Sequence, residues 1–367
     1  MKQRLWIISE LFPPEETSTA YIMGQIANTF SHKYEVGVIC GAEVYDKSRK
    51  QSTEGYSHGN YKIYRVESKT FNKNSIVGKA LSFVTTSYLL YKLAKRLIST
   101  NDKVLMVTNP APLVALISRL KTKRQFELNV LVHDVFPENL KAASLKLPFF
   151  NSIKKSFDKS FSRADRLIVI GRDMAEIMKA KTSGNVPVHI IENWGDFETV
   201  KPTHVPPKDK IIVEYAGNIG RVQGLETIAT SLPNDVELHI YGSGAYENKL
   251  KKMNKPNIFF HGPYTRTEQS TVLGACHISI VTLNDRMYGL GVPSKTYNIL
   301  ASGRPIIYFG PKNSEVELLI SEYNIGYCGW PKKWDFSELE EMGIKARKIG
   351  EANFSKEAIL KKFTDLI

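Results

Sequence analysis

Residues 211–225 have the sequence IIVEYAGNIGRVQGL, and this stretch decides the fold. Its first six residues, Ile211 to Ala216, begin with three β-branched residues and are apolar except at position 214, over the length of a buried strand. Glycines follow at positions 217, 220 and 224, and an apparent helix begins at Leu225. A buried strand that passes through a glycine turn into a helix indicates an α/β protein with a parallel sheet.

The same alternation of strand and helix runs along the rest of the chain. Helical patterns such as Ala20 to Phe30 and Pro112 to Lys121 separate the strand-like runs of the first half. These runs are Arg4 to Ile8, Tyr34 to Cys40, Lys103 to Thr108, Glu127 to Val132 and Arg166 to Ile170. In the second half they continue at Glu237 to Tyr241, Ile258 to Phe260, Ile278 to Leu283 and Pro305 to Phe309. The pattern predicts two doubly wound, Rossmann-like domains.

The length of the chain agrees with two domains. At 367 residues it exceeds the size at which one hydrophobic core keeps growing. Residues 193–210 show neither the helical nor the strand periodicity of apolar residues, and they contain three prolines. We therefore place the linker there. We expect one domain at 1–192 and a second at 211–352. The amphipathic segment at about 353–367, with Ser355 as a plausible N-cap, is expected to pack back on the first domain.

The cysteines and the N-terminus favour a cytoplasmic protein. Cys40, Cys276 and Cys328 are odd in number and far apart, and each lies in an apolar context where a thiol behaves as a small hydrophobe. Met1 to Ile8 lead directly into a short apolar strand and show no signal-peptide pattern. The most apolar helix candidate, Ile76 to Leu97, has too short an apolar run between its lysines to span a bilayer.

The charge of the chain predicts an acidic partner. Its formal net charge is +13 and its pI is near 9.4. Nucleic acid, anionic lipid and a phosphorylated substrate all satisfy this requirement, and charge alone does not choose among them.

The turn after Ala216 is the first candidate phosphate site. Gly217 and Gly220 let backbone amides approach a phosphate, Asn218 lies between them, and Arg221 can add bidentate hydrogen bonds. The alternative is that these glycines only permit a tight turn. Two further turns, at Gly242 to Gly244 and at His261 to Tyr264, allow a similar close approach at Gly242 and Gly262.

Residues 287–305 form the most distinctive stretch of the second half. Pro293 and Ser294 suit a helix start, which would direct free amides and Lys295 at a diphosphate. Gly291 and Val292 precede this start. The alternative makes Lys295 an ordinary solvated lysine of a first helical turn.

In the first half, polar residues follow two of the expected strands. His133 and Asp134 come directly after Glu127 to Val132, where a histidine can hydrogen-bond a sugar or phosphate and Asp134 can orient its ring or polarise a hydroxyl. A structural histidine and a capping aspartate are the alternative. Thr17, Ser18 and Thr19 precede the first helix and can face an interdomain cleft, although ordinary capping explains them equally well.

A basic segment, Leu140 to Arg166, favours membrane contact when it is taken together with Ile76 to Leu97 and the net charge. It places an apolar Leu147-Pro148-Phe149-Phe150 group before a helix that carries lysines around Phe157 and Phe161. Such a segment suits the plane of an anionic membrane. The alternative is a surface helix with both phenylalanines in the core.

Taken together, the motifs resemble the GT-B glycosyltransferases of the GT4 type, most closely the bacterial WbuB-like L-fucosamine transferases of surface polysaccharide synthesis. The resemblance covers nearly the whole chain. Its most specific matches are Gly217-Asn218-Ile219-Gly220 with Gln223-Gly224-Leu225-Glu226, and Val292-Pro293-Ser294-Lys295 with Asn298 to Pro305. Supporting matches are Phe12-Pro13-Pro14, His133-Asp134 and Glu192-Asn193-Trp194.

The resemblance implies a retaining transferase of two facing domains, with no cofactor and no metal. Arg221 and Lys295 would bind the donor diphosphate, while Gly262 and Tyr264 would lie by the base. His133 of the acceptor domain would face the transferred sugar. Implied partners are a nucleotide sugar and a polyprenyl-diphosphate-linked acceptor on the inner face of the plasma membrane, in capsule or O-antigen synthesis. The expected nucleotide is UDP, and an N-acetylated deoxy sugar is the candidate for the transferred group.

The sequence departs from the family pattern at three places. Leu290 and Asn298 occupy the positions of the family's paired glutamates, so that Asn298 can bond the ribose but supplies no carboxylate. Polar Thr17 to Thr19 replace the usual glycines of the first loop. The usual Arg and Lys pair of the donor loop is reduced to Arg221, with Gln223 nearby.

Two other functions are compatible with parts of the sequence. A nucleotide-sugar epimerase of the same fold would use the same donor loops, but it would need acid and base groups around the sugar and no membrane face. A basic, non-catalytic nucleic-acid binder would explain the charge, although the chain has no helix-turn-helix, zinc or aromatic-platform pattern.

Overall fold

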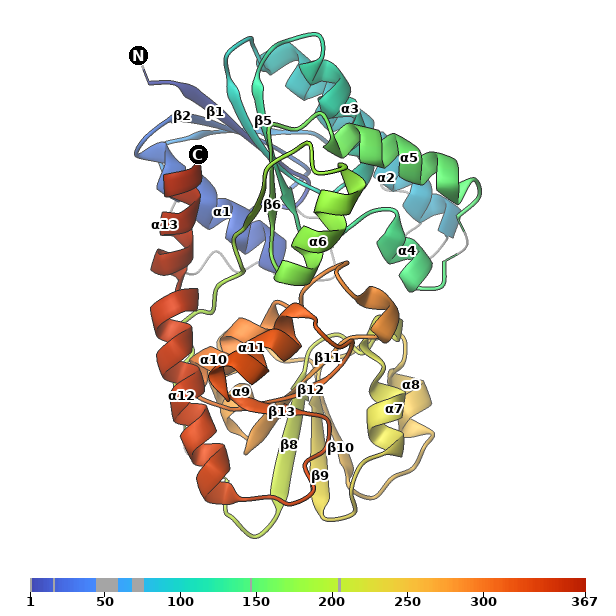
Figure 1. Cartoon of the computed structure of the whole chain (residues 1–367), viewed down its shortest axis with the longest axis vertical. Coiled ribbons are helices and arrows are strands. Elements are labelled where there is room, and N and C mark those ends of the chain that lie inside the picture. The colour runs from blue at the N-terminus through green and yellow to red at the C-terminus, as the bar shows by residue number, and fades with distance from the viewer. Residues whose placement is uncertain (1, 16, 44–58, 68–75, 146, 204–205) are drawn as a thin grey trace.

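The computed structural model describes residues 2–15, 17–43, 59–67, 76–145, 147–203 and 206–367, and these contain two parallel sheets that lie one above the other in Figure 1. Each sheet is flanked by helices on both faces, as expected for doubly wound domains. The two sheets belong to the two halves of the chain, and the chain passes from one to the other between residues 190 and 211.

The first sheet has seven strands in the order β3-β2-β1-β4-β5-β6-β7. The strands are β1 (Arg4–Ser9), β2 (Glu35–Cys40), β3 (Lys62–Arg65), β4 (Lys103–Val107), β5 (Glu127–Val132), β6 (Arg166–Val169) and β7 (Val188–Ile190). The helices are α1 (Ser18–Ser31), α2 (Ile76–Leu97), α3 (Ala111–Lys121), α4 (Glu138–Ala142), α5 (Phe150–Phe161) and α6 (Arg172–Lys181). Its central strands are almost completely buried, which explains their continuous apolar runs.

The second sheet has six strands in the order β10-β9-β8-β11-β12-β13. They are β8 (Ile211–Ala216), β9 (Val236–Tyr241), β10 (Ile258–Gly262), β11 (Ile278–Thr282), β12 (Ile306–Phe309) and β13 (Gly326–Cys328). The helices are α7 (Leu225–Thr230), α8 (Glu247–Lys251), α9 (Gln269–Gly274), α10 (Lys295–Ala301) and α11 (Glu315–Tyr323), with short 3₁₀ turns η1 (Arg221–Gln223) and η2 (Asp285–Met287). In both sheets the strand order reverses beside the first strand, where α/β proteins bind ligands.

The last two helices connect the domains a second time. Helix α12 (Phe336–Phe354) packs against α10, and α13 (Lys356–Leu366) packs against α1 of the first domain. At this crossing the amide of Gly195 donates to the carbonyl of Phe354 over 2.9 Å. The linker and the C-terminal crossing therefore lie side by side.

Several local expectations are corrected. The short strands β3, β7 and β13 were not expected; they lie at the sheet ends and are largely half-exposed, so their sequences lack a long apolar run. Cys40 and Cys276 are buried, but Cys328 is exposed because it ends the last strand of its sheet. Phe157 and Phe161 are both buried, so the core interpretation holds for these two rings.

Helix α2 matches the expected range, Ile76 to Leu97. Within the described part of the chain, no helix combines the length and the apolar character needed to cross a membrane.

Candidate functional site

The carboxyl ends of the two sheets face each other, and the residues that follow the strands make the contacts between the domains (Figure 1). The amide of Val135, just after β5, donates to the carbonyl of Leu290 over 3.1 Å. The amide of Gly289 donates to the Asp173 carboxylate over 3.2 Å. The long loop before α10 thus lies against the first domain.

The ends of β8, β9 and β10 meet at what we call the glycine edge, defined by Gly217, Gly242, Gly262 and Lys295. The amide of Gly242 donates to the carbonyl of Gly262 over 2.7 Å, and Gly217 donates to Tyr241 over 2.8 Å. A Cβ on Gly242 would lie 1.9 Å from the carbonyl oxygen of Gly217, and its φ of +135° is disfavoured for other residues. The backbones approach closely here only because side chains are absent.

Lys295 brings a cation to this edge from the start of α10. Its Nζ lies 3.4 Å from the carbonyl of Ala216 and 3.4 Å from the centre of the Tyr215 ring. A Cβ placed on Gly217 would lie 3.9 Å from the same Nζ. Burial lowers the pKa of Lys295, and the nearby Glu214 carboxylate opposes that shift. The ammonium is therefore close to bare main chain, as a phosphate site requires.

The other residues predicted to bind the diphosphate differ in their contacts. The carbonyl of Asn218 accepts from the Tyr215 hydroxyl over 2.7 Å, which fixes the turn. Gly220 is closely packed between the side chains of Asn218 and Gln223. Arg221 has partners outside the glycine edge: it donates to the Tyr246 hydroxyl over 2.8 Å and to the carbonyl of Ala143 in the other domain over 3.4 Å. Its contact with a diphosphate stays a prediction.

The loop into α10 connects the two edges. A Cβ on Gly291 would lie 3.5 Å from the Asp134 carboxylate, and one on Gly171 would lie 2.8 Å from the Val292 side chain. Ser294 is the N-cap residue without a side-chain cap bond. The carbonyl of Pro293 accepts from the amide of Thr296 over 3.1 Å.

Two residues predicted to contact the donor nucleoside have different surroundings. The Asn298 side chain accepts from the amide of Asp196 over 2.8 Å, so its observed partner is the linker. Tyr264 is half-buried beside Gly262, and desolvation raises its pKa to about 12, with a further contribution from Glu214. Contact of either residue with a nucleoside stays a prediction.

In the first domain His133 and Asp134 follow β5 and Glu10 follows β1, at the carboxyl ends of the strands, and we call these three residues the histidine edge. The amides of His133 and Asp134 both donate to the Thr108 hydroxyl, over 3.2 and 3.4 Å. Burial lowers the pKa of His133 to about 4, so its ring is neutral at pH 7. Its Nε2 is buried and has no partner among the described contacts. An orphaned ring nitrogen in this position can hydrogen-bond a ligand hydroxyl.

The neighbouring carboxyl groups are also shifted towards their neutral forms. Asp134 is solvent-accessible, yet the surrounding protein displaces enough water to raise its pKa. No hydrogen bond between the His133 ring and the Asp134 carboxylate occurs within the described residues. Glu10, at the end of β1, was missed by the sequence analysis; desolvation raises its pKa to about 7. Its place directly after an apolar strand was the signal that could have identified it.

Thr17, Ser18 and Thr19 lie at the start of α1. The Thr17 hydroxyl accepts from the amide of Ala20 over 3.2 Å, as an N-cap. Ser18 is exposed and Thr19 is half-buried. Capping therefore accounts for Thr17, and a role of all three towards an acceptor stays a prediction.

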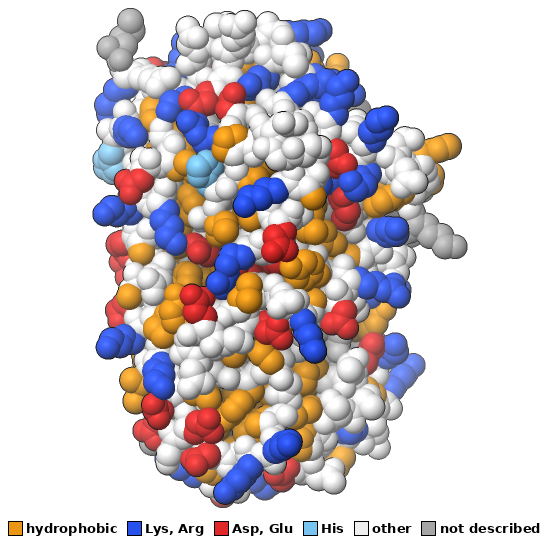
Figure 2. All heavy atoms as spheres, viewed as in Figure 1, with side chains coloured by type: hydrophobic (Ala, Val, Ile, Leu, Met, Phe, Trp, Pro, Cys, Tyr) orange, Lys and Arg blue, Asp and Glu red, His pale blue; other side chains and the backbone are white. Residues whose placement is uncertain are grey.

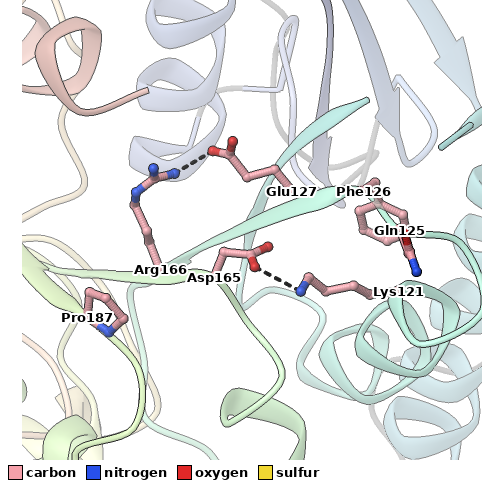
Figure 3. A pocket seen from close by; sticks show the side chains of 7 residues that line it. All are labelled: Lys121, Gln125, Phe126, Glu127, Asp165, Arg166 and Pro187. Atoms are coloured by element: carbon pink, nitrogen blue, oxygen red, sulfur yellow. Dashed lines mark hydrogen bonds and ion pairs between the residues drawn. The ribbon is translucent and has the colours of Figure 1, made fainter. Parts of the chain in front are cut away.

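A separate hollow of about 570 Å³ lies at the amino ends of β5 and β6, on the far side of the first sheet from both edges. Figure 3 shows that its charged side chains are paired with each other: Lys121 with Asp165 over 2.9 Å, and Arg166 with Glu127. Because these charges are satisfied, and because α/β proteins bind ligands at the opposite strand ends, we assign this hollow no role.

No family model matches the chain. It is 28% identical to the "Probable glycosyltransferase WbjE" of Pseudomonas aeruginosa, over 98% of this chain and 96% of that protein. In structure it is similar to sucrose-phosphate synthase from Thermosynechococcus elongatus, with a TM-score of 0.77, 13% identity and coverage of 100% and 98% of the two chains. It also resembles Anabaena HepE in complex with UDP, with a TM-score of 0.67, 12% identity and coverage of 100% and 99%. The prediction of two facing Rossmann-like domains is confirmed: the chain has the GT-B fold.

Proposed function

We propose that this chain is a glycosyltransferase that moves a sugar from a nucleoside diphosphate, with UDP as the nucleotide. The observation that carries the proposal is the position of Lys295, whose Nζ lies beside the bare main chain of Gly217. A full-length relative named as a probable glycosyltransferase and a fold neighbour that binds UDP both support it.

Binding of UDP, GDP and ADP, measured by calorimetry, tests the donor site. We expect UDP to bind best, and Lys295→Ala to weaken it about 10- to 100-fold, because hydrogen bonds to charged groups contribute about 1.5–3 kcal/mol. Lys249→Ala is the matched control, since this exposed lysine of α8 pairs with Glu226. Equal binding by wild type and Lys295→Ala would contradict the site. Arg221→Ala tests whether Arg221 reaches the diphosphate despite its contact with Tyr246.

In the proposed reaction, Lys295 and the amides of the glycine edge neutralise the leaving diphosphate, so that no metal is needed. Neutral His133 hydrogen-bonds the transferred sugar from the opposite edge. The resemblance to GT4 enzymes supports retention of the anomeric configuration. Activity that persists in a chelator and an NMR spectrum of the product's anomeric proton test these two points. Formation of an epimerised sugar nucleotide without acceptor would favour the epimerase instead.

We further propose a polyprenyl-diphosphate-linked acceptor at the inner face of the plasma membrane, in the synthesis of a surface polysaccharide such as capsule or O-antigen. Support comes from an apolar edge, defined by Leu81, Val84 and Tyr88 of α2 and by Phe149 before α5. All four side chains are exposed, Phe149 by 84%. Helices α2 and α5 are linked through the Phe136 ring, which contacts Phe83 and Phe157.

The backbone and the charges around Phe149 strengthen this proposal. Phe149 has a φ of +55°, which is uncommon for a bulky residue, while its ring points into solvent. Exposed Lys155 and Lys159 follow on α5. In Figure 2, hydrophobic side chains project beside Lys and Arg at the edge where Figure 1 places α4 and α5. This combination suits the interface of an anionic bilayer.

Vesicle flotation tests the membrane proposal. We expect binding to vesicles that contain anionic lipid and weaker binding to neutral ones. Phe149→Ser should weaken binding about 10-fold or more, because burying a phenylalanine contributes about 1.5–3 kcal/mol. Ile344→Ser, at an exposed position of α12 on the other domain, is the matched control. Equal flotation of the two variants would exclude Phe149 as an anchor.

A further inference from the structure

An arginine of the second domain lies directly on a tyrosine of the first. Arg266 follows β10, in the loop that also carries Gly262 and Tyr264, which we call the nucleoside loop (residues 262–268). Its guanidinium carbon lies over the Tyr21 ring of α1, 3.9 Å from the ring centre. At this distance the guanidinium and the ring are in cation–π contact. Neither residue takes part in the proposed reaction, so the contact calls for another explanation.

The Asp196 carboxylate fixes the orientation of this guanidinium. Nη2 of Arg266 donates to Asp196 Oδ2 over 3.0 Å, and the Asp196 side chain is only 9% exposed. Asp196 is held in turn, because its Oδ1 accepts from the amide of Thr199 over 3.3 Å and its own amide donates to Asn298 of α10 over 2.8 Å. A guanidinium can donate hydrogen bonds in its plane while its face stacks on an aromatic ring. Arg266 is therefore fixed to the second domain and presents its cation to the first.

Tyr21 is fixed within the first domain. Its amide donates to the carbonyl of Thr17 over 3.0 Å at the start of α1. Its ring lies beside the buried ring of Trp194, with the ring centres 6.2 Å apart. Ser18 and Thr19, which are predicted to face the acceptor, belong to the same first turn of α1. The contact with Arg266 thus joins the predicted acceptor residues to the nucleoside loop.

The nucleoside loop is short and internally bonded. Glu268 Oε2 accepts from both the amide and the hydroxyl of Thr265, each over 2.7 Å. At the other end of the loop, the carbonyl of Gly262 accepts from the amide of Gly242 over 2.7 Å. Because the loop is held at both ends, a displacement of Arg266 would also displace Tyr264.

We propose that Arg266 is a positioning residue that clamps α1 to the second domain and so holds the nucleoside loop in place relative to the predicted acceptor residues. The clamp consists of Arg266, Asp196 and Tyr21. Its consequence for sugar transfer rests on the proposed function, whereas the clamp itself does not. A rotation of one domain against the other would alter the contact between Arg266 and Tyr21, because each is fixed within its own domain. The clamp therefore favours the interdomain arrangement of this structure.

Hydrogen exchange resolved to single amides tests the clamp, because the amides of Val135 and Gly289 both donate across the domain interface. We expect Arg266→Ala to raise the exchange rate of these two amides about 3- to 30-fold, the factor that corresponds to the loss of a cation–π contact. The amides of Asp165 and Leu238 donate within one domain, over 2.9 Å each, and their exchange should not change. A purely structural role of Arg266 would instead accelerate exchange at all four amides.

Substitutions of Tyr21 provide the second arm of the test. Tyr21→Leu removes the ring and should accelerate exchange as much as Arg266→Ala does, whereas Tyr21→Phe keeps the ring and should stay within about twofold of wild type. The double variant Arg266→Ala/Tyr21→Leu should exchange no faster than either single variant, because both remove the same contact. Lys362→Ala is the matched control, since it removes the same charge and an ion pair between α13 and Glu192.

Three results would overturn the inference: unchanged exchange at Val135 and Gly289 in Arg266→Ala, equal acceleration of all four amides, or additive effects in the double variant. These measurements need no ligand. A chain that binds none of UDP, GDP and ADP would overturn the proposed function and leave the clamp standing.

Discussion

The glycine edge and the histidine edge face each other but are built from different materials. The glycine edge exposes main chain and one cation, and its shape depends on residues without side chains. The histidine edge carries ionisable side chains whose pKa values are shifted towards the neutral form by burial. Fixed dipoles and a cation suit an anion, whereas neutral donors and acceptors suit hydroxyl groups. Under the proposed function, the diphosphate would therefore bind at the glycine edge and the sugar at the histidine edge.

The largest effect is expected at His133. Replacement by alanine should lower kcat about 100-fold or more, the usual contribution of a positioned acid–base or hydrogen-bonding group, and leave the Kd for UDP unchanged within about twofold. Steady-state kinetics and calorimetry measure the two quantities. His32→Ala, at the exposed end of α1, is the control. A similar loss of UDP affinity in His133→Ala would contradict the assignment of donor binding to the glycine edge alone.

At the glycine edge, Gly242→Ala should lower the stability of the protein without changing its charge. The new Cβ would meet the carbonyl of Gly217 at 1.9 Å and would also require a positive φ. We expect the free energy of unfolding to fall by about 3 kcal/mol, with loss of UDP binding. Gly184→Ala also has a positive φ but open space around it, so it should cost about 1 kcal/mol. Equal costs in chemical denaturation would argue against a close approach of the two loops.

The pH dependence of the free energy of unfolding should reveal a further difference, because an ionisable carboxyl group lies at the histidine edge. The pKa of Glu10 is raised to about 7 in the folded protein from an ordinary value of 4.5, so the folded state holds its proton more tightly than the unfolded state. Its contribution to stability is therefore present below pH 4.5 and is lost as the pH rises to about 7. Glu10→Gln should be more stable than wild type by about 2 kcal/mol at pH 8 and nearly equal at pH 4.5. Denaturation at both pH values tests this, with Glu35→Gln at the exposed start of β2 as control.

The smallest effect concerns one of the contacts between the two domains. Arg172 of the first domain donates two side-chain bonds of 3.1 Å and an amide bond of 2.6 Å to Glu315 of the second. Glu315→Gln weakens this pairing and should lower the free energy of unfolding by about 1–2 kcal/mol, because Glu315 is buried but Arg172 is partly exposed. Glu322→Gln removes only an exposed partner of Arg172 and should cost less than about 0.5 kcal/mol. Identical thermal stabilities would show that this pair does not link the domains.

The sequence predicted the class of fold because the central strands are apolar runs that end in polar or glycine turns. It did not predict β3, β7 and β13. These strands are short, lie at the ends of their sheets and lack a long apolar run. The family resemblance implied that Lys295 and the loop after Ala216 share one site, and the Lys295 Nζ does lie 3.4 Å from the carbonyl of Ala216.

Directions of side chains were harder to predict than positions. Arg221 adjoins Gly220 in sequence, yet Tyr246 and Ala143, which are distant in sequence, decide where its guanidinium points. Glu214 was overlooked because the surrounding run is apolar. An acidic residue inside such a run was itself the available signal, since a buried carboxylate requires partners.

The place where the chain crosses between the domains twice has a mechanical consequence. Gly195 of the linker and Ser355 before α13 form a parallel bridge, so both covalent connections pass through one spot. Figure 1 shows this spot at one side of the molecule, with α4, which contacts η2, at the other. Two tethers at a single point act as a pivot: they oppose sliding of one domain over the other and allow a jaw-like rotation. Such a rotation would separate the domains most at the end farthest from the pivot, between α4 and η2.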